Sequence, residues 1–284
     1  MAKEISIFSK SDSRSTRTKK RLAEILKQNG FSVKDDSQNP GDLIVCIGGD
    51  GTFLKTIHHF DFPCTPVIGI NTGHLGFFQE ISPEELDQFV QLYKAGRYNI
   101  QPYKGIQGKI FAEGRQHDIQ GMNEIVIRGE RSIHLNVSIG NSFIQKFSGD
   151  GILLCTPAGS TAYNYSLGGS IVDPSLDVLQ ITPIAPMNTS AYRSFTSSVI
   201  VPEGKLITVE PEKGSSKAVL VITDGRTSKY KAIDKIQVKL SDKTVHLLRL
   251  ENYDFWDKVK VKLLDSSGEG LTECLNDRNK RKKT

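Results

Sequence analysis

The chain has few cysteines and no long apolar run. Its 284 residues include four cysteines, none of them in a CxxC pair: Cys46, Cys64, Cys155 and Cys274. Paired-cysteine zinc and redox motifs are therefore excluded, and reduced thiols are expected, as in the cytosol. No apolar run approaches about 18 residues, and no charged-then-apolar leader opens the chain. We therefore expect a soluble, cytoplasmic protein without membrane contact.

Clustered positive charge is also missing from most of the chain. The formal net charge is +5, but the last nine residues carry +4 of it, through Arg278, Lys280, Arg281, Lys282 and Lys283 against Asp277. The other residues are nearly balanced and hold no basic cluster of the kind that binds nucleic acid. We expect no nucleic-acid partner, and a disordered basic tail over residues 267–284. Of the six histidines, His58 and His59 are adjacent and so point to different helix faces, and the other four are scattered, so no metal site built from protein ligands alone is expected.

Alternating strand and helix patterns occupy residues 1–97. Short apolar runs at residues 5–8, 43–47 and 67–70 predict strands, and the run at 43–47 is apolar throughout, as in a strand covered on both faces. Helical patterns lie at residues 16–29, 53–60 and 83–95, the last with Ser82, Pro83 and Glu85 as start signals. This order predicts an α/β domain with a parallel, Rossmann-like sheet.

Residues 98–250 consist of short β-prone runs separated by Gly, Asn, Asp and Pro. The runs lie at residues 109–112, 124–128, 134–139, 142–147, 152–155, 198–201, 206–210, 218–222 and 244–250. They predict an all-β second domain, a β-sandwich. The apolar segment within residues 251–266 is expected to pack back on the first domain.

A glycine-rich turn, Gly48-Gly49-Asp50-Gly51-Thr52, follows the buried run at residues 43–47. In doubly wound proteins backbone N–H groups converge at such a strand-to-helix turn and bind phosphates, and glycine leaves room for their approach. Neither the GxxxxGK[ST] phosphate loop nor the GxGxxG dinucleotide fingerprint is present. The turn therefore predicts a phosphate site of another kind.

Asp50 is the informative residue of this turn. A carboxylate repels phosphate, so it stands there to work with Mg²⁺, to accept a proton from an attacking hydroxyl, or to do both. In the alternative interpretation the glycines only make a tight turn and Asp50 caps the next helix. Lys55, about one turn into that helix, is either a phosphate contact or a solvated surface lysine.

Three further polar segments lie in the second domain: Asn123-Glu124, Gly149-Asp150-Gly151 and the run TPAGSTAY at residues 156–163. The Glu124 carboxylate is able to accept hydrogen bonds from both hydroxyls of a ribose, with the Asn123 amide beside it. In the TPAGSTAY run, a Pro-Ala-Gly turn leads to a serine that caps a short helix, whose free N–H groups face a ligand. Taken separately, Asn123-Glu124 also has a structural interpretation as the end of a turn, and the Thr-Pro-Ala-Gly run has one as a loop and cap. Asp224-Gly225 is interpreted as a hairpin turn in preference to a ligand site.

Together, the GGDGT turn, Asn123-Glu124, Gly149-Asp150-Gly151 and the TPAGSTAY run, in this order, resemble the motif set of NAD kinases. The resemblance extends along most of the chain, as far as Asp224-Gly225. It implies an enzyme that transfers the terminal phosphoryl group of ATP to the 2′-hydroxyl of the adenosine ribose of NAD, giving NADP. It also implies Mg²⁺ or another divalent metal with ATP, and self-association as a homodimer or homotetramer.

The resemblance also implies a role for each matching residue, with Asp50 as the general base. The ATP phosphates would contact Gly48, Gly49, Gly51, Thr52 and Lys55. NAD would contact Asp50, Gly51, Phe77, Asn123, Glu124, Ser148, Asp150, Ala158, Thr161, Ala162, Tyr163, Asn164, Tyr165, Ser166 and Ala185, some of them from a neighbouring subunit. Two departures from the family pattern stand out. Ser148 replaces an Arg or Lys found in many members, and residues 182–187 lack a His that some relatives carry.

Two other functions share part of this pattern. A lipid or sphingoid-base kinase has a GGDGT-type loop, but it needs an apolar lipid pocket and leaves Asn123-Glu124 and the TPAGSTAY run without a purpose. A non-catalytic sensor would bind NAD or NADP without consuming ATP. Polyphosphate remains open as a donor in place of ATP, as does NADH as an acceptor in place of NAD.

Overall fold

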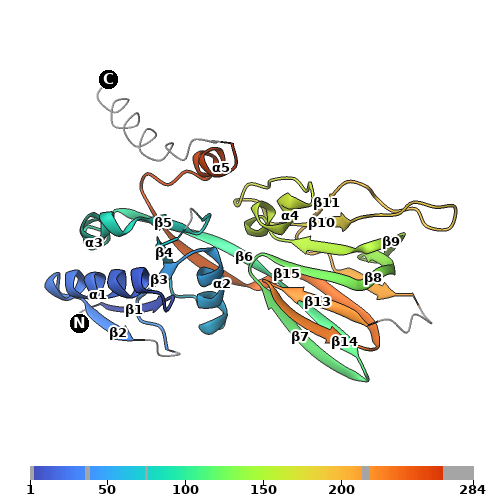
Figure 1. Ribbon diagram of the computed structural model, residues 1–284, viewed down its shortest axis with the longest axis horizontal. Helices are drawn as coiled ribbons and strands as arrows, with labels where there is room; N and C mark the ends of the chain where they lie inside the picture. The colour runs from blue at the N-terminus through green and yellow to red at the C-terminus, as the bar shows by residue number, and fades with distance from the viewer. Residues whose placement is uncertain (1–2, 36–38, 74–75, 213–217, 265–284) are drawn as a thin grey trace. The chain divides into compact units, whose positions relative to one another are not determined.

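The computed structural model describes residues 3–35, 39–73, 76–212 and 218–264 (Figure 1). They form two compact units. The first lies within Met1–Thr56, Thr65–Gln101 and Leu247–Thr284, and the second is Ile57–Cys64 with Pro102–His246. The basic tail expected at residues 267–284, and Cys274 within it, lie outside the described residues.

The first unit is built on a parallel sheet. Its strands are β1 (Glu4–Ser9), β2 (Ser32–Asp35), β3 (Leu43–Gly48), β4 (Val67–Asn71) and β5 (Gln79–Ile81). Strand β1 lies between β2 and β3, and β4 pairs with β3 and with β5. All of these pairings are parallel, as is the one between β4 and the end of β15 (Ile233–Leu250) at Leu247. Every residue of β3 is buried, as its apolar sequence predicts.

Helices α1 (Ser13–Gln28) and α3 (Leu86–Lys94) bury apolar faces in the core of this unit. Helix α1 begins three residues before the predicted position, because the Asp12 side chain accepts from Ser15 N at 2.9 Å and caps it there. The first turn of the predicted third helix is instead a separate 3₁₀ turn, η1 (Pro83–Glu85). Its start signal is present, since Ser82 N donates to Glu85 Oε2 at 2.8 Å.

Helix α2 (Asp50–His59) corrects the prediction of a helix at residues 53–60. Thr52 N and Phe53 N already donate to Gly49 O, at 2.8 and 3.0 Å, so the helical pattern begins within the glycine turn. Asp50 is the first residue of the helix, where the helix dipole favours an acid.

The second unit is β-rich. Its strands are β6 (Tyr98–Ala112, with the first residues in the first unit), β7 (Arg115–Gly121), β8 (Glu124–Ile139), β9 (Ser142–Cys155), β10 (Val178–Ile184), β11 (Val199–Pro202), β12 (Ile207–Pro211), β13 (Val219–Thr223) and β14 (Arg226–Tyr230), with most of β15. Strand β8 is central and pairs antiparallel with β9, β12 and β13. An apolar cluster drawn from these strands forms the core of the unit.

Several strands of this unit are longer than the sequence predicted. Strand β8 joins the runs at 124–128 and 134–139 across an irregularity between Arg128 and Ile133. Strand β9 continues through Gly149-Asp150-Gly151, which is therefore part of a strand and not a loop. Strand β7 was not predicted, because its sequence RQHDIQG is polar; its pairing with β6 forms it.

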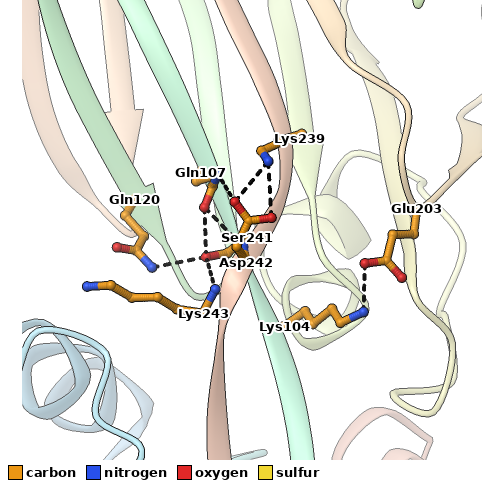
Figure 2. A network of polar contacts seen from close by, with 8 residues as sticks. All are labelled: Lys104, Gln107, Gln120, Glu203, Lys239, Ser241, Asp242 and Lys243. Carbon is orange, nitrogen blue, oxygen red and sulfur yellow. Dashed lines mark hydrogen bonds and ion pairs between the residues drawn. The ribbon is translucent and has the colours of Figure 1, made fainter.

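A polar network ties β6, β7 and β15 together in this unit (Figure 2). Gln107 Oε1 accepts from Ser241 Oγ and Asp242 N, both at 3.1 Å, and Gln120 Nε2 donates to the same Ser241 hydroxyl. Lys239 pairs with Asp242 at 2.9 Å. The polar atoms of this network are thus used within the sheet itself.

The predicted fold class is confirmed: a parallel α/β domain is followed by a β-rich one. Among the described residues, no helix is long and apolar enough to cross a membrane. Cys46, Cys64 and Cys155 are free thiols, of which Cys64 is exposed and the other two are buried. Burial raises the pKa of Cys46 to about 12 and also raises that of Cys155.

Candidate active site

The glycine turn of the first unit has one filled side and one open side. A Cβ on Gly48 would lie 2.4 Å from Thr52 Oγ1, so only glycine allows the turn to close on that side. A Cβ on Gly49 or Gly51 would meet nothing within 4 Å. The start of α2 is therefore open beside these two glycines, as a phosphate-binding helix start requires.

Asp50 is held at this turn by backbone N–H groups. Its Oδ2 accepts from Phe77 N at 2.9 Å, and its Oδ1 accepts from Phe78 N at 3.0 Å. A Cβ on Gly76 would lie 2.3 Å from Oδ1, so glycine at this position makes room for the carboxylate. Two charge-assisted hydrogen bonds thus fix the orientation of a half-buried acid.

Helix α5 (Phe255–Leu263) supplies two lysines to this region. Lys262 Nζ lies 3.3 Å from Asp50 Oδ2 and 4.2 Å from the centre of the Phe77 ring. Lys258 Nζ donates to the backbone oxygens of Phe77 and Gln79. Lys55, by contrast, is exposed on α2.

In the second unit, the turn that opens β8 is organised by Asp224. This carboxylate is fully buried and accepts from Met122 N at 2.7 Å, Asn123 N at 2.8 Å and Glu124 N at 3.3 Å. His58 Nε2 donates to the same carboxylate at 2.8 Å. Asp224 and Gly225 form the predicted two-residue hairpin turn, between β13 and β14, with φ of +46° and +78°.

The beginning of the TPAGSTAY run packs on the other side of this turn. Thr156 N donates to Asn123 O at 2.9 Å, and Thr156 Oγ1 donates to Met122 O at 2.8 Å. A Cβ on Gly159 would lie 2.3 Å from Asn123 O, so the two backbones touch at a glycine. The structure therefore brings together two of the predicted segments, Asn123-Glu124 and the TPAGSTAY run.

The side chains of Asn123 and Glu124 keep acceptors that no protein group uses. Asn123 Oδ1 and Glu124 Oε2 are buried and have no hydrogen-bond partner. Burial and, second, the Asp224 carboxylate raise the pKa of Glu124 to about 8. Unpaired buried acceptors are costly, and a ligand that supplies hydroxyl or amine donors would satisfy them.

Other predicted residues of the TPAGSTAY region differ in exposure. Tyr163, Tyr165 and Ser166 are exposed, on the short helix α4 (Tyr163–Ser166) or at its end, after η2 (Ala158–Thr161). Asn164 is buried, and its amide is used by Ser160 O, Ser170 O and Thr182 Oγ1 at 3.1, 3.1 and 2.6 Å. The serine expected to cap the helix, Ser160, is also buried, and its hydroxyl accepts from Val172 N at 3.0 Å. The Asn164 and Ser160 side chains therefore stabilise the loop that carries the exposed residues.

Ser148, Asp150 and Ala185 form a separate group in the second unit. Met187 N donates to Ser148 O at 2.7 Å, and a Cβ on Gly149 would lie 2.6 Å from Ala185 O. Glu124 pairs with Cys155, which is five residues beyond Asp150 on β9. At about 3.3 Å per residue, Asp150 is roughly 16 Å along the strand from the pairing partner of Glu124.

Sequence reasoning missed several residues of these two sites. Asp224 was assigned to a turn, and its contact with residues 122–124 depends on the pairing of β13 with β8. His58 had no distinguishing pattern. Lys258 and Lys262 stand four apart on a helix that has only an ordinary alternation of polar and apolar residues.

The described residues were also compared with the requirements of a metal site and of a ligand cavity. Within the residues that the structure describes, no three His, Cys, Asp or Glu side chains are grouped so as to hold a metal ion. A cavity of about 510 Å³ in the second unit is lined by Gln107, Gln120 and Lys239 of the polar network, with Asp61 and Asp118. None of its lining residues was predicted as a site residue.

Comparison with known proteins agrees with the geometry of both units. Residues 36–98 match the ATP-NAD kinase N-terminal domain, and residues 122–250 match the ATP-NAD kinase C-terminal domain. The chain belongs to the NAD kinase family. It is 34% identical over 269 residues to the NAD kinase of Finegoldia magna, with 93% of this chain and 98% of that protein covered. It is 32% identical to NAD kinase 1 of Oceanobacillus iheyensis, with 92% and 98% covered.

Solved structures share the fold of this NAD kinase family member. The yeast NADH kinase complexed with NADH has a TM-score of 0.82 at 20% identity, with 94% of this chain and 88% of that chain covered. The NAD kinase from Archaeoglobus fulgidus in complex with ATP has a TM-score of 0.71 at 24% identity, with 87% and 94% covered. The chain is accordingly an enzyme, a phosphotransferase with an alcohol group as acceptor.

Proposed function

We propose that this enzyme transfers the terminal phosphoryl group of ATP to the 2′-hydroxyl of the adenosine ribose of NAD, giving NADP, with Asp50 as the general base. The observation that carries the role of Asp50 is its place beside the open glycines, with a carboxylate oriented by Phe77 N and Phe78 N. A ribose hydroxyl is a weak nucleophile near neutral pH, so a positioned base within about 3 Å accelerates its attack.

Asp50 Oδ2 accepts from Phe77 N and Lys262 Nζ, whereas Oδ1 accepts from Phe78 N and keeps further lone-pair capacity. The proton of the hydroxyl passes to this capacity while the hydroxyl oxygen attacks the terminal phosphorus. The bond between that phosphorus and its bridging oxygen breaks, and ADP leaves. The glycine N–H groups at the start of α2 would stabilise the charge that develops on the phosphoryl oxygens.

NAD recognition is assigned to Asn123 and Glu124. Their buried oxygens have no protein partner and are available for hydrogen bonds with a ribose diol and an amino group. The other proposed NAD contacts are Gly51, Phe77, Ser148, Asp150, Ala158, Thr161, Ala162, Tyr163, Tyr165, Ser166 and Ala185. Asn164 is proposed to act through the backbone of its loop, because its amide is already used. Gly48, Gly49, Thr52 and Lys55 are proposed phosphate contacts.

We propose that a divalent metal arrives with ATP. Asp50 is the single carboxylate of the glycine turn. Mg²⁺, held by the ATP phosphates and within reach of Asp50, would neutralise phosphate charge.

Self-association as a homodimer or homotetramer is part of the proposal. Asp150 lies far along β9 from Cys155, the residue that pairs with Glu124. This separation supports self-association, because a second copy of the chain would then supply the group of Ser148, Asp150 and Ala185. The free thiols of Cys46, Cys64 and Cys155 are consistent with the proposed cytoplasmic location.

A coupled assay tests the activity. Purified protein is mixed with ATP, Mg²⁺ and NAD, and NADP is detected with an NADP-specific dehydrogenase. The assay is then repeated with NADH as acceptor and with polyphosphate as donor. Formation of NADP that requires a phosphoryl donor supports the proposal. NAD binding without any phosphoryl transfer would indicate the non-catalytic sensor. The other alternative, a lipid kinase, is not favoured by the match to both family domains.

A further inference from the structure

Helix α5 (Phe255–Leu263) follows residue 250, where the match to the C-terminal family domain ends. It begins at a capped position, since Asp257 N donates to Asp254 Oδ1 at 2.8 Å. Lys258 and Lys262 are four residues apart and therefore lie on the same face of the helix. Both reach the surroundings of Asp50, which is in the same unit.

The backbone at residues 77–79 lies between the Asp50 carboxylate and the Lys258 amino group. Its N–H groups at Phe77 and Phe78 donate to the Asp50 carboxylate, at 2.9 and 3.0 Å. Its carbonyl oxygens at Phe77 and Gln79 accept from Lys258 Nζ. Phe77 O and Phe78 N belong to one peptide group, so the hydrogen bond from Lys258 to this carbonyl stabilises the conformation in which the Phe78 N–H faces Asp50.

Lys262 contacts the carboxylate itself. Its Nζ lies 3.3 Å from the same Oδ2 that accepts from Phe77 N, and over the Phe77 ring at 4.2 Å from its centre. Phe255 also lies near this ring, with the two ring centres 6.4 Å apart. The lysine and Asp50 side chains are 27% and 29% exposed, so their attraction is partly screened.

We propose that α5 is a positioning element for Asp50, in which Lys262 sets the direction of the carboxylate and Lys258 fixes the backbone that holds it. This inference rests on the proposed role of Asp50 as general base. A half-exposed ion pair contributes little to stability, on the order of 1 kcal/mol or less. Its effect on the placement of a base is larger, because a misplacement of about 1 Å costs up to about 10²-fold in rate.

Lys262 offers the sharper test, because replacing Lys258 disturbs more than Asp50. Burial and, second, the charge of Arg249 lower the pKa of Lys258, and Arg249 is itself paired with Glu80 at 3.4 Å. Lys260 gives a matched control: it is exposed, on the same helix, and carries the same charge. The variants Lys262→Met, Lys262→Arg and Lys260→Met are compared with the unchanged protein for kcat, for KM of NAD and of ATP, and for Tm.

We expect Lys262→Met to lower kcat about tenfold or more, with both KM values changed less than about twofold and Tm lowered by no more than a few degrees. Lys262→Arg should recover most of the turnover, because it restores a cation beside Oδ2. Lys260→Met should behave as the unchanged protein. This pattern separates positioning of the base from stability and from net charge.

Three results would overturn the inference. Turnover of Lys262→Met at or above the unchanged rate would show that α5 does not assist Asp50. An equal loss in Lys260→Met would assign the effect to net charge, and a loss of turnover that follows Tm would assign it to folding. If the unchanged protein makes no NADP at all, the proposed function fails first, and that result is distinct from these three.

Discussion

His58 Nε2 donates a hydrogen bond of 2.8 Å to Oδ2 of Asp224, the carboxylate that also holds the backbone N–H groups of residues 122–124. His58 comes from the last turn of α2, and its ring meets that of Phe62 edge-on, with centres 5.1 Å apart. The histidine thereby orients a carboxylate that carries no substrate contact of its own in this proposal. The geometry of Asn123 and Glu124 follows from that carboxylate.

Asp224→Asn is expected to raise KM for NAD about tenfold or more, with KM for ATP nearly unchanged. The amide keeps one acceptor oxygen, but its NH₂ group opposes either His58 or the backbone donors, so charge-assisted bonds worth roughly 1.5 to 3 kcal/mol are lost. Steady-state kinetics with each substrate varied in turn measures the difference. Equal increases for both substrates would count against a specific effect on NAD.

Asp50→Asn is expected to lower turnover by roughly 10²-fold or more, the scale of general-base catalysis, while NAD still binds. Turnover is measured by NADP formation, and NAD binding by calorimetry on the same preparation. Near-normal turnover would remove the role of general base from this residue. Loss of NAD binding together with turnover would indicate that the asparagine disturbs the turn at Phe77 and Phe78.

NAD affinity is expected to increase as the pH rises through about 8, because the pKa of Glu124 is raised to about 8 and the ionised carboxylate accepts stronger hydrogen bonds from ribose hydroxyls. Glu124→Gln should abolish this dependence and weaken binding at high pH. Calorimetric titration of NAD between pH 6.5 and about 9.5, a window around that pKa, measures both. Identical pH profiles for the two proteins would contradict the assignment.

The same raised pKa predicts the opposite trend for stability. Between the usual carboxyl pKa of 4.5 and about 8, the folded protein retains a proton on Glu124 that the unfolded chain has lost, so stability falls as the pH rises. Glu124→Gln should therefore gain Tm relative to the unchanged protein as the pH rises through this window. A constant difference in Tm would show that Glu124 is not buried as an acid.

Gly76→Ala is expected to lower turnover more than tenfold, because its Cβ would lie 2.3 Å from Asp50 Oδ1 and 2.1 Å from Gln79 Oε1. Gly73→Ala is the matched control, since a Cβ there would meet nothing within 4 Å. The ratio of the two turnover rates is the measurement. Equal rates would show that the carboxylate moves aside without cost to the reaction.

Much of the fold was predictable from local pattern. The buried apolar run at 43–47 predicted strand β3, and the start signals at Ser82 and Pro83 predicted where helical structure begins, because burial and capping act over a few residues. Strand β7 could not be predicted in this way, since its polar sequence is held by pairing with β6. Pairing between distant strands is a property of the whole chain.

The same contrast holds for the candidate site. The glycine turn and Asn123-Glu124 could be identified from residue types that suit phosphate and ribose. The residues that hold these segments in place could not be identified from the sequence, because Asp224 is 100 residues from Glu124 and Lys262 is 212 residues from Asp50. Groups that act through the backbone of others, as Lys258 does, leave no motif of their own.

The different exposure of the thiols allows selective chemical labelling. Cys46 and Cys155 are buried with raised pKa values, so they present neither access nor thiolate to an alkylating reagent, whereas Cys64 is exposed. Among the described residues, a maleimide dye would therefore mark Cys64 selectively. Replacement of Cys274, which lies beyond them, would leave a uniquely labelled enzyme for fluorescence measurements of nucleotide binding.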